Sequence, residues 1–172
     1  MGHKIFQIDT SFRPTSDSYS RRSGQYFIRK FQEKFGQLEV SYLDLARDYP
    51  NKYILASMCD SNIWLWCLSA EVSILPDSFV EWMNFLHRQN FILNQSCSIK
   101  PLAKKSVIIA NWQKETDVLS PKFHVEPQIR HGINLLGIDD IEFFHMFQKD
   151  NTMEGEINLQ KDINKYIADL HL

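Results

Sequence analysis

The sequence is poor in cysteine, glycine and proline. Its 172 residues include 3 Cys, 6 Gly and 6 Pro. Cys59, Cys67 and Cys97 are odd in number and form no CxxC pair, so we expect neither a disulfide framework nor a zinc site. The low glycine and proline content, together with 44% hydrophobic residues, excludes collagen-like and disordered proteins. The composition therefore predicts a folded protein of a reducing compartment.

The sequence also lacks an excess of charge of one sign and a long apolar run. It has 19 Lys and Arg against 21 Asp and Glu, so no broad positive field is available to bind nucleic acid or an anionic membrane. No stretch approaches the roughly 20 apolar residues of a membrane helix, and residues 1–8 lack the apolar core of a signal peptide. We expect a cytoplasmic protein with no nucleic-acid partner and no membrane partner, in which any anion is bound locally.

The sequence does contain short β-rich runs that alternate with helical patterns, within a length that suits one domain over residues 1–172. Each run is rich in Ile, Val, Trp, Phe or Tyr, which predicts a strand. The five predicted strands are 4–9, 39–45, 62–68, 106–112 and 140–147.

Helices are predicted between these strands from apolar residues at helical spacing. Phe27, Phe31 and Phe35 share one face before Gly36, which is a typical C-terminal stop. Ser78 and Glu81 have the spacing of a capping box for a helix over about 77–93. Segment 50–61 is less clear and has room for one short helix.

Two later helices are predicted in the same way. The first is expected to begin at Ser120-Pro121 and to end at Gly137. The apolar positions of the two helices are Val125, Ile129, Ile133 and Leu136, and then Leu159, Ile163, Tyr166, Ile167 and Leu170.

Strands that alternate with helices imply right-handed crossovers and a parallel sheet covered on both faces. For five strands this predicts an α/β, flavodoxin-like three-layer sandwich with strand order 2-1-3-4-5. Ligands of such sheets bind beyond the carboxyl ends of the strands, at the switch point beside the first and third strands. We therefore expect the functional site in the loops after Asp9, Leu68 and Trp112.

The loop after the first predicted strand, residues 10–22, is a hydroxyl-rich entry to a helix. A phosphate there can accept hydrogen bonds from amides of the first helical turn and from serine hydroxyls, and the helix dipole favours its negative charge. The same residues have a purely structural interpretation, because Ser16, Asp17 or Ser18 is a common helix cap. The residues alone leave both interpretations open.

Three strings in the first part of the chain are informative together: Ile8-Asp-Thr-Ser-Phe-Arg-Pro, Ser18-Tyr-Ser-Arg and Tyr42-Leu-Asp-Leu-Ala-Arg-Asp. Two later strings follow in order: Ile74-Leu-Pro-Asp-Ser-Phe-Val-Glu-Trp and Leu135-Leu-Gly-Ile-Asp-Asp. In these strings the chain resembles the FMN-dependent NADH-azoreductase and NAD(P)H:quinone reductase family, which has a flavodoxin-like fold. The resemblance spans nearly the whole chain.

The resemblance implies a set of cofactor-binding residues in three loops. Ser11, Ser18 and Ser20, with the amide of Tyr19, are expected to hold the FMN phosphate. The expected flavin-ring contacts come from two further loops: Ala70, Glu71, Val72 and Ser73, and then Asn111, Trp112, Gln113 and Lys114.

Both ring loops depart from the family pattern. Residues 69–73 replace a Pro-x-Tyr-Asn-like loop, and a Glu71 carboxylate close to the ring would oppose the negative charge of reduced flavin unless it points to solvent. Residues 111–114 replace a Gly pair, so the cofactor shifts, stacks on Trp112 or is excluded. Lys114 either supplies positive charge to reduced flavin or is solvated.

Other chemistries have little support in the sequence. His124, His131 and His145 lack a close Cys or second His, so no metal site is expected. No Gly-x-Ser-x-Gly motif indicates a hydrolase. The aromatic residues of the strands are expected in the core: Trp64, Trp66, Phe143, Phe144 and Phe147.

The leading hypothesis is an FMN-dependent oxidoreductase that transfers electrons from NAD(P)H to a quinone or azo compound. Because the flavin carries that chemistry, no catalytic residue is assigned to the protein. The resemblance also implies a homodimer. A second hypothesis, motivated by the altered ring loops, is a noncatalytic flavodoxin-like relative with weakened or lost flavin binding that acts as a binding or interaction protein. A third is a binding module that uses an anion pocket at Ser18–Ser20 for another nucleotide or phosphate.

Overall fold

The structure, a computed structural model, describes residues 2–49, 51–70, 75–96, 105–112, 124–147 and 153–171. Its strands form one parallel sheet in the order β2-β1-β3-β4-β5, which confirms the predicted topology. The observed bounds lie within two residues of the predicted ones: β1 (His3–Asp9), β2 (Leu38–Asp44), β3 (Ile63–Ala70), β4 (Lys105–Trp112) and β5 (Asp140–Phe147).

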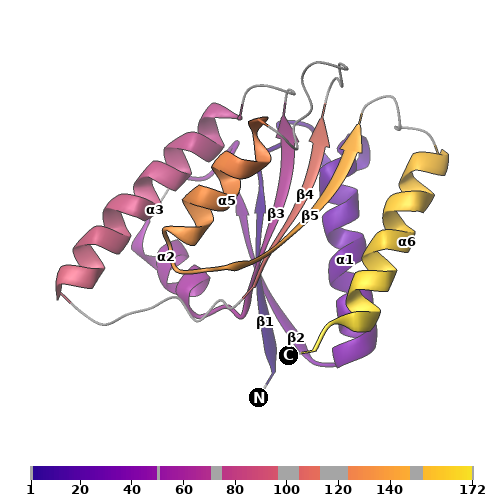
Figure 1. The fold of residues 1–172 in the computed structure, drawn as a ribbon, viewed down its shortest axis with the longest axis horizontal. Coiled ribbons are helices and arrows are strands. Elements are labelled where there is room, and N and C mark those ends of the chain that lie inside the picture. Colours follow the sequence, from indigo (N-terminus) through magenta and orange to yellow (C-terminus); the bar gives the residue numbers. More distant parts are fainter. Residues whose placement is uncertain are drawn as a thin grey trace.

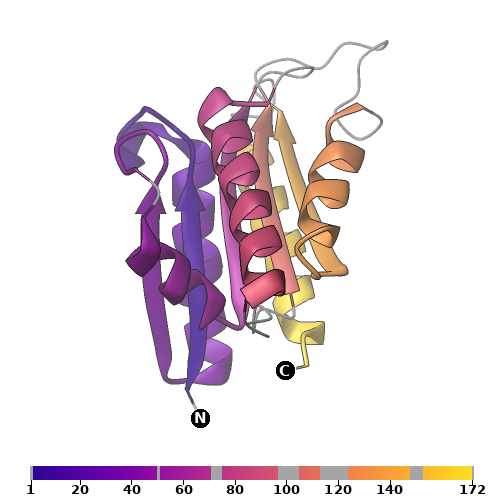
Figure 2. The same ribbon diagram turned by 90° about the vertical axis from the view of Figure 1, so that its left-hand side faces the viewer.

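Helices cover both faces of the sheet, so the described residues form three layers (Figures 1 and 2). One face is covered by α1 (Tyr19–Phe35) and α6 (Met153–Asp169). The other is covered by α2 (Lys52–Cys59), α3 (Asp77–Ser96) and α5 (Glu126–Asn134). Segment 50–61 thus holds the short helix for which it has room, and a 3-10 turn, η1 (Thr15–Asp17), precedes α1.

The two faces of the sheet have different cores. On the α1 and α6 face, Phe27 and Phe31 of α1 pack with Leu159, Ile163 and Ile167 of α6. The opposite core contains four tryptophans, each no more than 2% exposed: Trp64, Trp66, Trp82 and Trp112. The predicted apolar stripes are therefore confirmed as core-facing, and the predicted burial of the strand aromatic residues is confirmed for Trp64, Trp66 and Phe144.

The ends of the helices correct two predictions. Helix α3 begins at Asp77, and the carbonyl of Pro76 accepts from the amides of Phe79 and Val80. Ser78 therefore lies inside the first turn, and the predicted capping box is wrong. Helix α5 ends at Asn134, before a turn that contains Gly137 (φ +88°), whereas its predicted start at Ser120-Pro121 lies outside the described residues.

Helix α1 approaches the sheet closely at one glycine. A Cβ added at Gly24 would overlap the Sγ of Cys67 on β3 and would lie 3.3 Å from the side-chain nitrogen of Gln7 on β1. Both strand residues are buried. The missing side chain thus lets the first turns of α1 lie directly over the carboxyl halves of β1 and β3.

Among the helices in the described ranges, none is long and apolar enough to cross a membrane.

Candidate functional site

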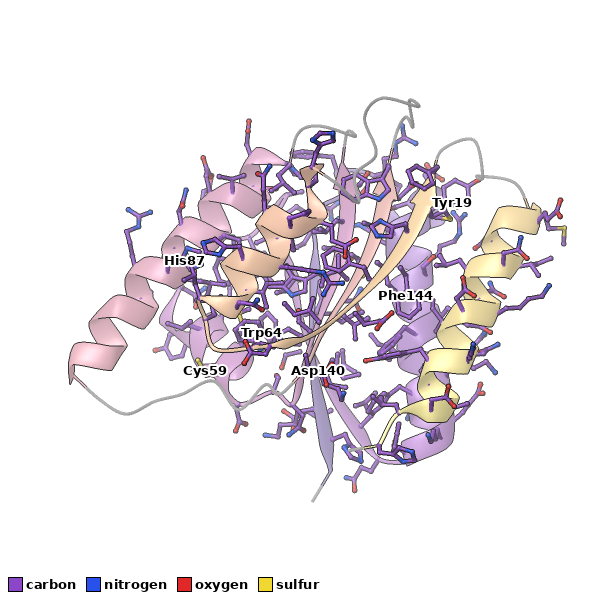
Figure 3. The ribbon with its side chains drawn as sticks, in the orientation of Figure 1. Tyr19, Cys59, Trp64, His87, Asp140 and Phe144 are labelled. Atoms are coloured by element: carbon purple, nitrogen blue, oxygen red, sulfur yellow. The ribbon has the colours of Figure 1, made fainter. Side chains whose placement is uncertain are left out.

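The carboxyl ends of the strands and the amino end of α1 lie at the same edge of the sheet (Figure 1). Asp9, the last residue of β1, is in register with Asp44 of β2 and with Cys67 of β3. Figure 3 shows Tyr19 at the end of α1 that lies beside this edge. The expected site therefore lies where the topology places it, next to the switch point between β1 and β3.

Of the three serine residues predicted to hold phosphate, Ser18 and Ser20 lie side by side here, and Ser11 is joined to them through Arg21. Ser18 is the N-cap of α1, and its Oγ accepts from the amide of Arg21 at 3.4 Å and lies 3.2 Å from the Oγ of Ser20. Ser11, Ser18 and Ser20 are all buried, with at most 4% of each exposed. We call Ser11, Ser18 and Ser20 the serine cradle. The prediction that one of residues 16–18 caps the helix is therefore confirmed for Ser18, while Ser16 and Asp17 belong to η1.

A buried charged network lies beneath the serine cradle. The Nη2 atom of Arg21 donates to the main-chain oxygen of Ser11 and, at 2.8 Å, to Oδ2 of Asp44. Its Nη1 atom donates to the Tyr42 hydroxyl at 2.7 Å and lies 3.6 Å from Oδ2 of Asp9. We call Arg21, Asp9, Asp44 and Tyr42 the Arg21 network.

Burial and the neighbouring carboxylates shift the pKa values in and beside this network. The Tyr42 hydroxyl donates to Asp9 at 2.9 Å, and burial together with the Asp9 carboxylate raises the pKa of Tyr42. Burial lowers the pKa of Arg21, but its hydrogen bond to Asp44 and the nearby negative groups outweigh that effect and raise it. Burial, followed by Asp9, raises the pKa of the Cys67 thiol well above its usual range. The network thus includes a cation and a neutral phenol, and a neutral thiol lies beside it.

The geometry of the serine cradle fits a phosphate group. The first amides of an α-helix have no carbonyl partner within the helix and carry the positive end of its dipole. Two buried hydroxyls lie beside them. The Nε atom of Arg21 is buried and has no hydrogen-bond partner among the described residues. A tetrahedral anion with several acceptor oxygens could satisfy such a set of donors.

The flavin-ring loops are described only at their edges. Ala70 ends β3 beside Trp112, which ends β4, and Ser69 is in register with Asn111. Glu71, Val72, Ser73, Gln113 and Lys114 lie outside the described residues. The Oδ1 atom of Asn111 is buried without a hydrogen-bond partner in the described part of the chain. Asn111 and the ends of β3 and β4 are therefore the described part of the expected ring site.

Trp112 is fully buried and belongs to a second network. Its Nε1 donates to Nδ1 of His145 at 3.0 Å, and Nε2 of His145 lies 2.8 Å from Oε2 of Glu126. The other carboxylate oxygen of Glu126 accepts from Arg130 at 2.7 Å. We call Trp112, His145, Glu126 and Arg130 the Trp112 network. The indole has no exposed face in this structure on which a flavin could stack.

A hollow of about 410 Å³ lies apart from the serine cradle, between β5 and the first half of α6. Its lining includes the carboxylates of Glu154 and Asp162 with Asn158 and Leu159. Two acidic groups disfavour an anionic ligand. In the ranges that the structure describes, no group of three or more His, Cys, Asp or Glu side chains is placed to hold a metal ion.

The fold is that of solved flavin oxidoreductases, although sequence identity to them is low. No family model matches the sequence, and no curated protein matches it. An FMN-dependent NADH-azoreductase from Bacillus anthracis, solved with FMN, superposes with a TM-score of 0.72 and 14% identity over 96% of this chain and 98% of its own. An NAD(P)H:quinone oxidoreductase from Methanothermobacter marburgensis gives 0.68 and 10% identity over 100% of both chains.

A third structure, an NADPH-quinone reductase from P. pentosaceus, gives a TM-score of 0.61 and 12% identity over 99% of this chain and 100% of its own. These proteins bear the names of the family that the sequence strings resemble. At such identities the likeness establishes the flavodoxin-like α/β fold, with its five parallel strands, rather than an activity.

Sequence reasoning assigned no role to Arg21, Tyr42 or Asp44, although all three lie in the strings that carry the resemblance. The structure joins two of those strings through the Arg21 side chain. The sequence does contain a pattern that indicates this network. Near the ends of the first two predicted strands, polar residues stand two positions apart: Gln7 and Asp9 in the first, and Tyr42 and Asp44 in the second. Such residues share a face of a strand, so two adjacent parallel strands bring them together.

Proposed function

We propose that the protein is an FMN-dependent oxidoreductase that transfers electrons from NAD(P)H to a quinone or azo compound. The observation that carries the proposal is the serine cradle, in which the hydroxyls of Ser18 and Ser20 are buried together at the amino end of a 17-residue helix. Its place beside β1 and β3 is the expected ligand position in this topology. The fold shared with a protein named as an FMN-dependent NADH-azoreductase supports the same assignment.

In this proposal the protein binds and orients the cofactor. When bound, FMN supplies the two-electron chemistry itself. Ser11, Ser18 and Ser20, with the amide of Tyr19, hold its phosphate, and the main chain at Ala70 and Asn111 borders its ring. No acid, base or nucleophile of the protein is required. Contact between the cofactor and residues 71–73 and 113–114 stays a prediction from the sequence.

The experiment that tests the proposal is a titration of the purified protein with FMN, followed by visible absorption and flavin fluorescence. We expect a shifted flavin spectrum and quenched fluorescence, with affinity in the micromolar range or tighter, about −8 kcal/mol. Riboflavin, which lacks the phosphate, should bind more weakly. The loaded protein should then oxidise NADH or NADPH when a soluble quinone is present.

A second candidate function is favoured by the packing at the end of β4. The buried Trp112 indole occupies that region and is held by His145. This packing suits a noncatalytic relative that keeps the fold and acts as a binding protein. Failure to bind FMN at tens of micromolar protein, which corresponds to about 6 to 7 kcal/mol, together with no oxidation of NAD(P)H, would favour this candidate.

We also propose a homodimer, because the resembled family usually completes each flavin pocket with a second subunit. Exposed aromatic side chains, among them Phe12, Tyr49 and Tyr53, are compatible with burial across an interface. Sedimentation at tens of micromolar protein should show a dimer, and a monomer at that concentration, well above ordinary dimer dissociation constants, would contradict the proposal. A cytoplasmic location stays a prediction from composition.

A further inference from the structure

Arg21 is a buried cation whose side chain joins three separate segments of the chain. It is 5% exposed. Its terminal nitrogens donate to the main chain of Ser11 after β1 and to Asp44 and Tyr42 on β2, while its own backbone belongs to the first turn of α1. A guanidinium is suited to this task, because its five donors lie in one rigid plane. A flexible ammonium cannot reproduce these contacts together.

The same residue also reaches the hydroxyls of the serine cradle. The amide of Arg21 donates to the Oγ of Ser18, which lies 3.2 Å from the Oγ of Ser20. Arg21 therefore holds the cradle at both ends, with its side chain on Ser11 and its backbone on Ser18. Loss of the side chain would release Ser11 from the start of α1.

The Nε–H group of Arg21 is available to donate a hydrogen bond to a ligand. The buried Nε–H has no partner among the described residues. In a guanidinium this N–H lies on the same edge as Nη2, and Nη2 is the nitrogen that contacts Ser11. Nη2 also donates to Asp44, so the unpartnered donor lies on the edge of the guanidinium that contacts Ser11 and Asp44.

Two buried carboxylates close to Arg21 increase the expected effect of losing its positive charge. Asp9 and Asp44 are adjacent in register, and both are within 4 Å of the guanidinium. Without the cation, two buried carboxylates would face each other beneath the cradle and would repel any anion above them. Arg21 therefore offsets part of this negative charge and stabilises the empty cradle.

We propose that Arg21 is a positioning residue for the phosphate of the cofactor: its guanidinium clamps Ser11, α1 and the end of β2 so that the serine cradle is preformed. This inference rests on the proposed function, since FMN is the ligand considered. The clamp nevertheless concerns a phosphate group, and inorganic phosphate tests it without a flavin.

The test compares FMN with riboflavin in Arg21→Met, Arg21→Lys and the wild-type protein by flavin fluorescence quenching. Arg21→Met should weaken FMN binding about tenfold, equivalent to about 1.4 kcal/mol, and riboflavin binding less than about twofold. Arg21→Lys keeps the charge but not the planar fork, so most of the loss should remain. Arg29→Met removes an exposed charge from the same helix and should behave as wild type.

Three results would overturn the clamp. An unchanged ratio of FMN to riboflavin affinity in folded Arg21→Met would show that Arg21 has only a structural role. Full recovery in Arg21→Lys would show that charge alone is needed. If Arg21→Met does not fold, Tyr42→Phe provides the test, because it removes one hydrogen bond of the clamp while Arg21 stays in place. Tyr42→Phe should weaken FMN binding about threefold, equivalent to less than 1 kcal/mol. An unchanged FMN affinity in this variant would equally count against the clamp.

A second readout separates this inference from the proposed function. Inorganic phosphate is titrated into ¹⁵N-labelled protein, and the amide resonances of Tyr19 and Ser20 are followed by NMR. They should shift in the wild type and in Arg29→Met but not in Arg21→Met. If FMN fails to bind while phosphate gives this pattern, the proposed function is wrong and the clamp stands. If phosphate shifts neither resonance in the wild type, the cradle and the clamp are both wrong.

Discussion

The two halves of the carboxyl edge use different chemistry. At the β1 and β2 end, the Arg21 network lies beside buried serine hydroxyls, and the buried Nε of Arg21 has no hydrogen-bond partner among the described residues. At the β4 and β5 end, the Trp112 network fills the space with an indole, an imidazole and an ion pair whose polar atoms are satisfied by one another. The first half thus keeps an unpartnered buried donor, whereas the polar groups of the Trp112 network contact one another.

This difference bears on how a flavodoxin-like fold is used. The sheet and helices position both halves equally well, so the fold alone does not decide whether a ligand binds. What decides it is whether donors at the edge are left for the ligand or are used within the protein. Changes in the first half should therefore alter ligand binding and stability together, whereas changes in the second half should alter stability alone.

The largest expected effect is on stability, from removing a carboxylate of the Arg21 network. Asp44→Ala leaves the buried Arg21 guanidinium without its closest carboxylate and removes the acceptor for the amide of Ala46. Breaking a buried ion pair in this way should lower the free energy of unfolding by about 3 kcal/mol. Urea denaturation followed by tryptophan fluorescence measures it.

Arg47→Ala is the matched control for Asp44→Ala. Arg47 lies 3.6 Å from the same Asp44 oxygen, but its side chain is mostly exposed. Exposed ion pairs contribute little, so the change should stay within about 0.5 kcal/mol. Equal losses in the two variants would contradict the view that burial makes the Arg21 network important.

The next effect tests the close approach of α1 to the sheet. Gly24→Ala puts a Cβ against the Sγ of Cys67 and should cost about 2 kcal/mol through overpacking, although alanine is the better helix former. Thermal or urea unfolding measures the loss. Cys67→Ala in the same chain should restore part of it, because it removes the sulfur that the new methyl group meets. If Cys67→Ala restores no stability to the Gly24→Ala protein, the strain arises at another contact.

The serine cradle is expected to give a smaller effect, on binding as well as on stability, because Ser18 is also the N-cap of α1. Replacing Ser18 and Ser20 together by Ala removes two buried hydroxyls and should weaken FMN at least tenfold, about 1.4 kcal/mol or more. Flavin fluorescence quenching measures the change, and Ser16→Ala, in the exposed part of η1, is the control. Unchanged FMN affinity in the double variant would refute the placement of the phosphate.

The sequence predicts the fold well and the site only in part, for a physical reason. Strands and helices follow from periodic burial, and residues such as Phe27, Phe31 and Ile163 lie in the core as their spacing indicates. The Arg21 network depends instead on the register of β1 against β2, which local patterns do not contain. Likewise, Trp112 lies at the edge as the sequence predicts, but its partner His145 and the next residue of the network, Glu126, are distant from it in sequence.

The smallest expected effect on flavin binding comes from the Trp112 network. Trp112→Phe removes the hydrogen bond to His145 and part of a buried ring, and it should lower the free energy of unfolding by about 1 to 2 kcal/mol. Because the indole is fully buried, FMN affinity should change by less than about twofold, under 0.5 kcal/mol.

Both quantities for Trp112→Phe can be measured on one protein sample, with urea unfolding for stability and fluorescence quenching for FMN. A large loss of FMN affinity with unchanged stability would reverse the comparison of the two halves, because the indole would then contact the cofactor. Loss of stability with unchanged affinity would show that the indole has a structural role and does not contact the cofactor. The contrast between Trp112→Phe and the double serine variant is therefore the sharpest test of which half binds the cofactor.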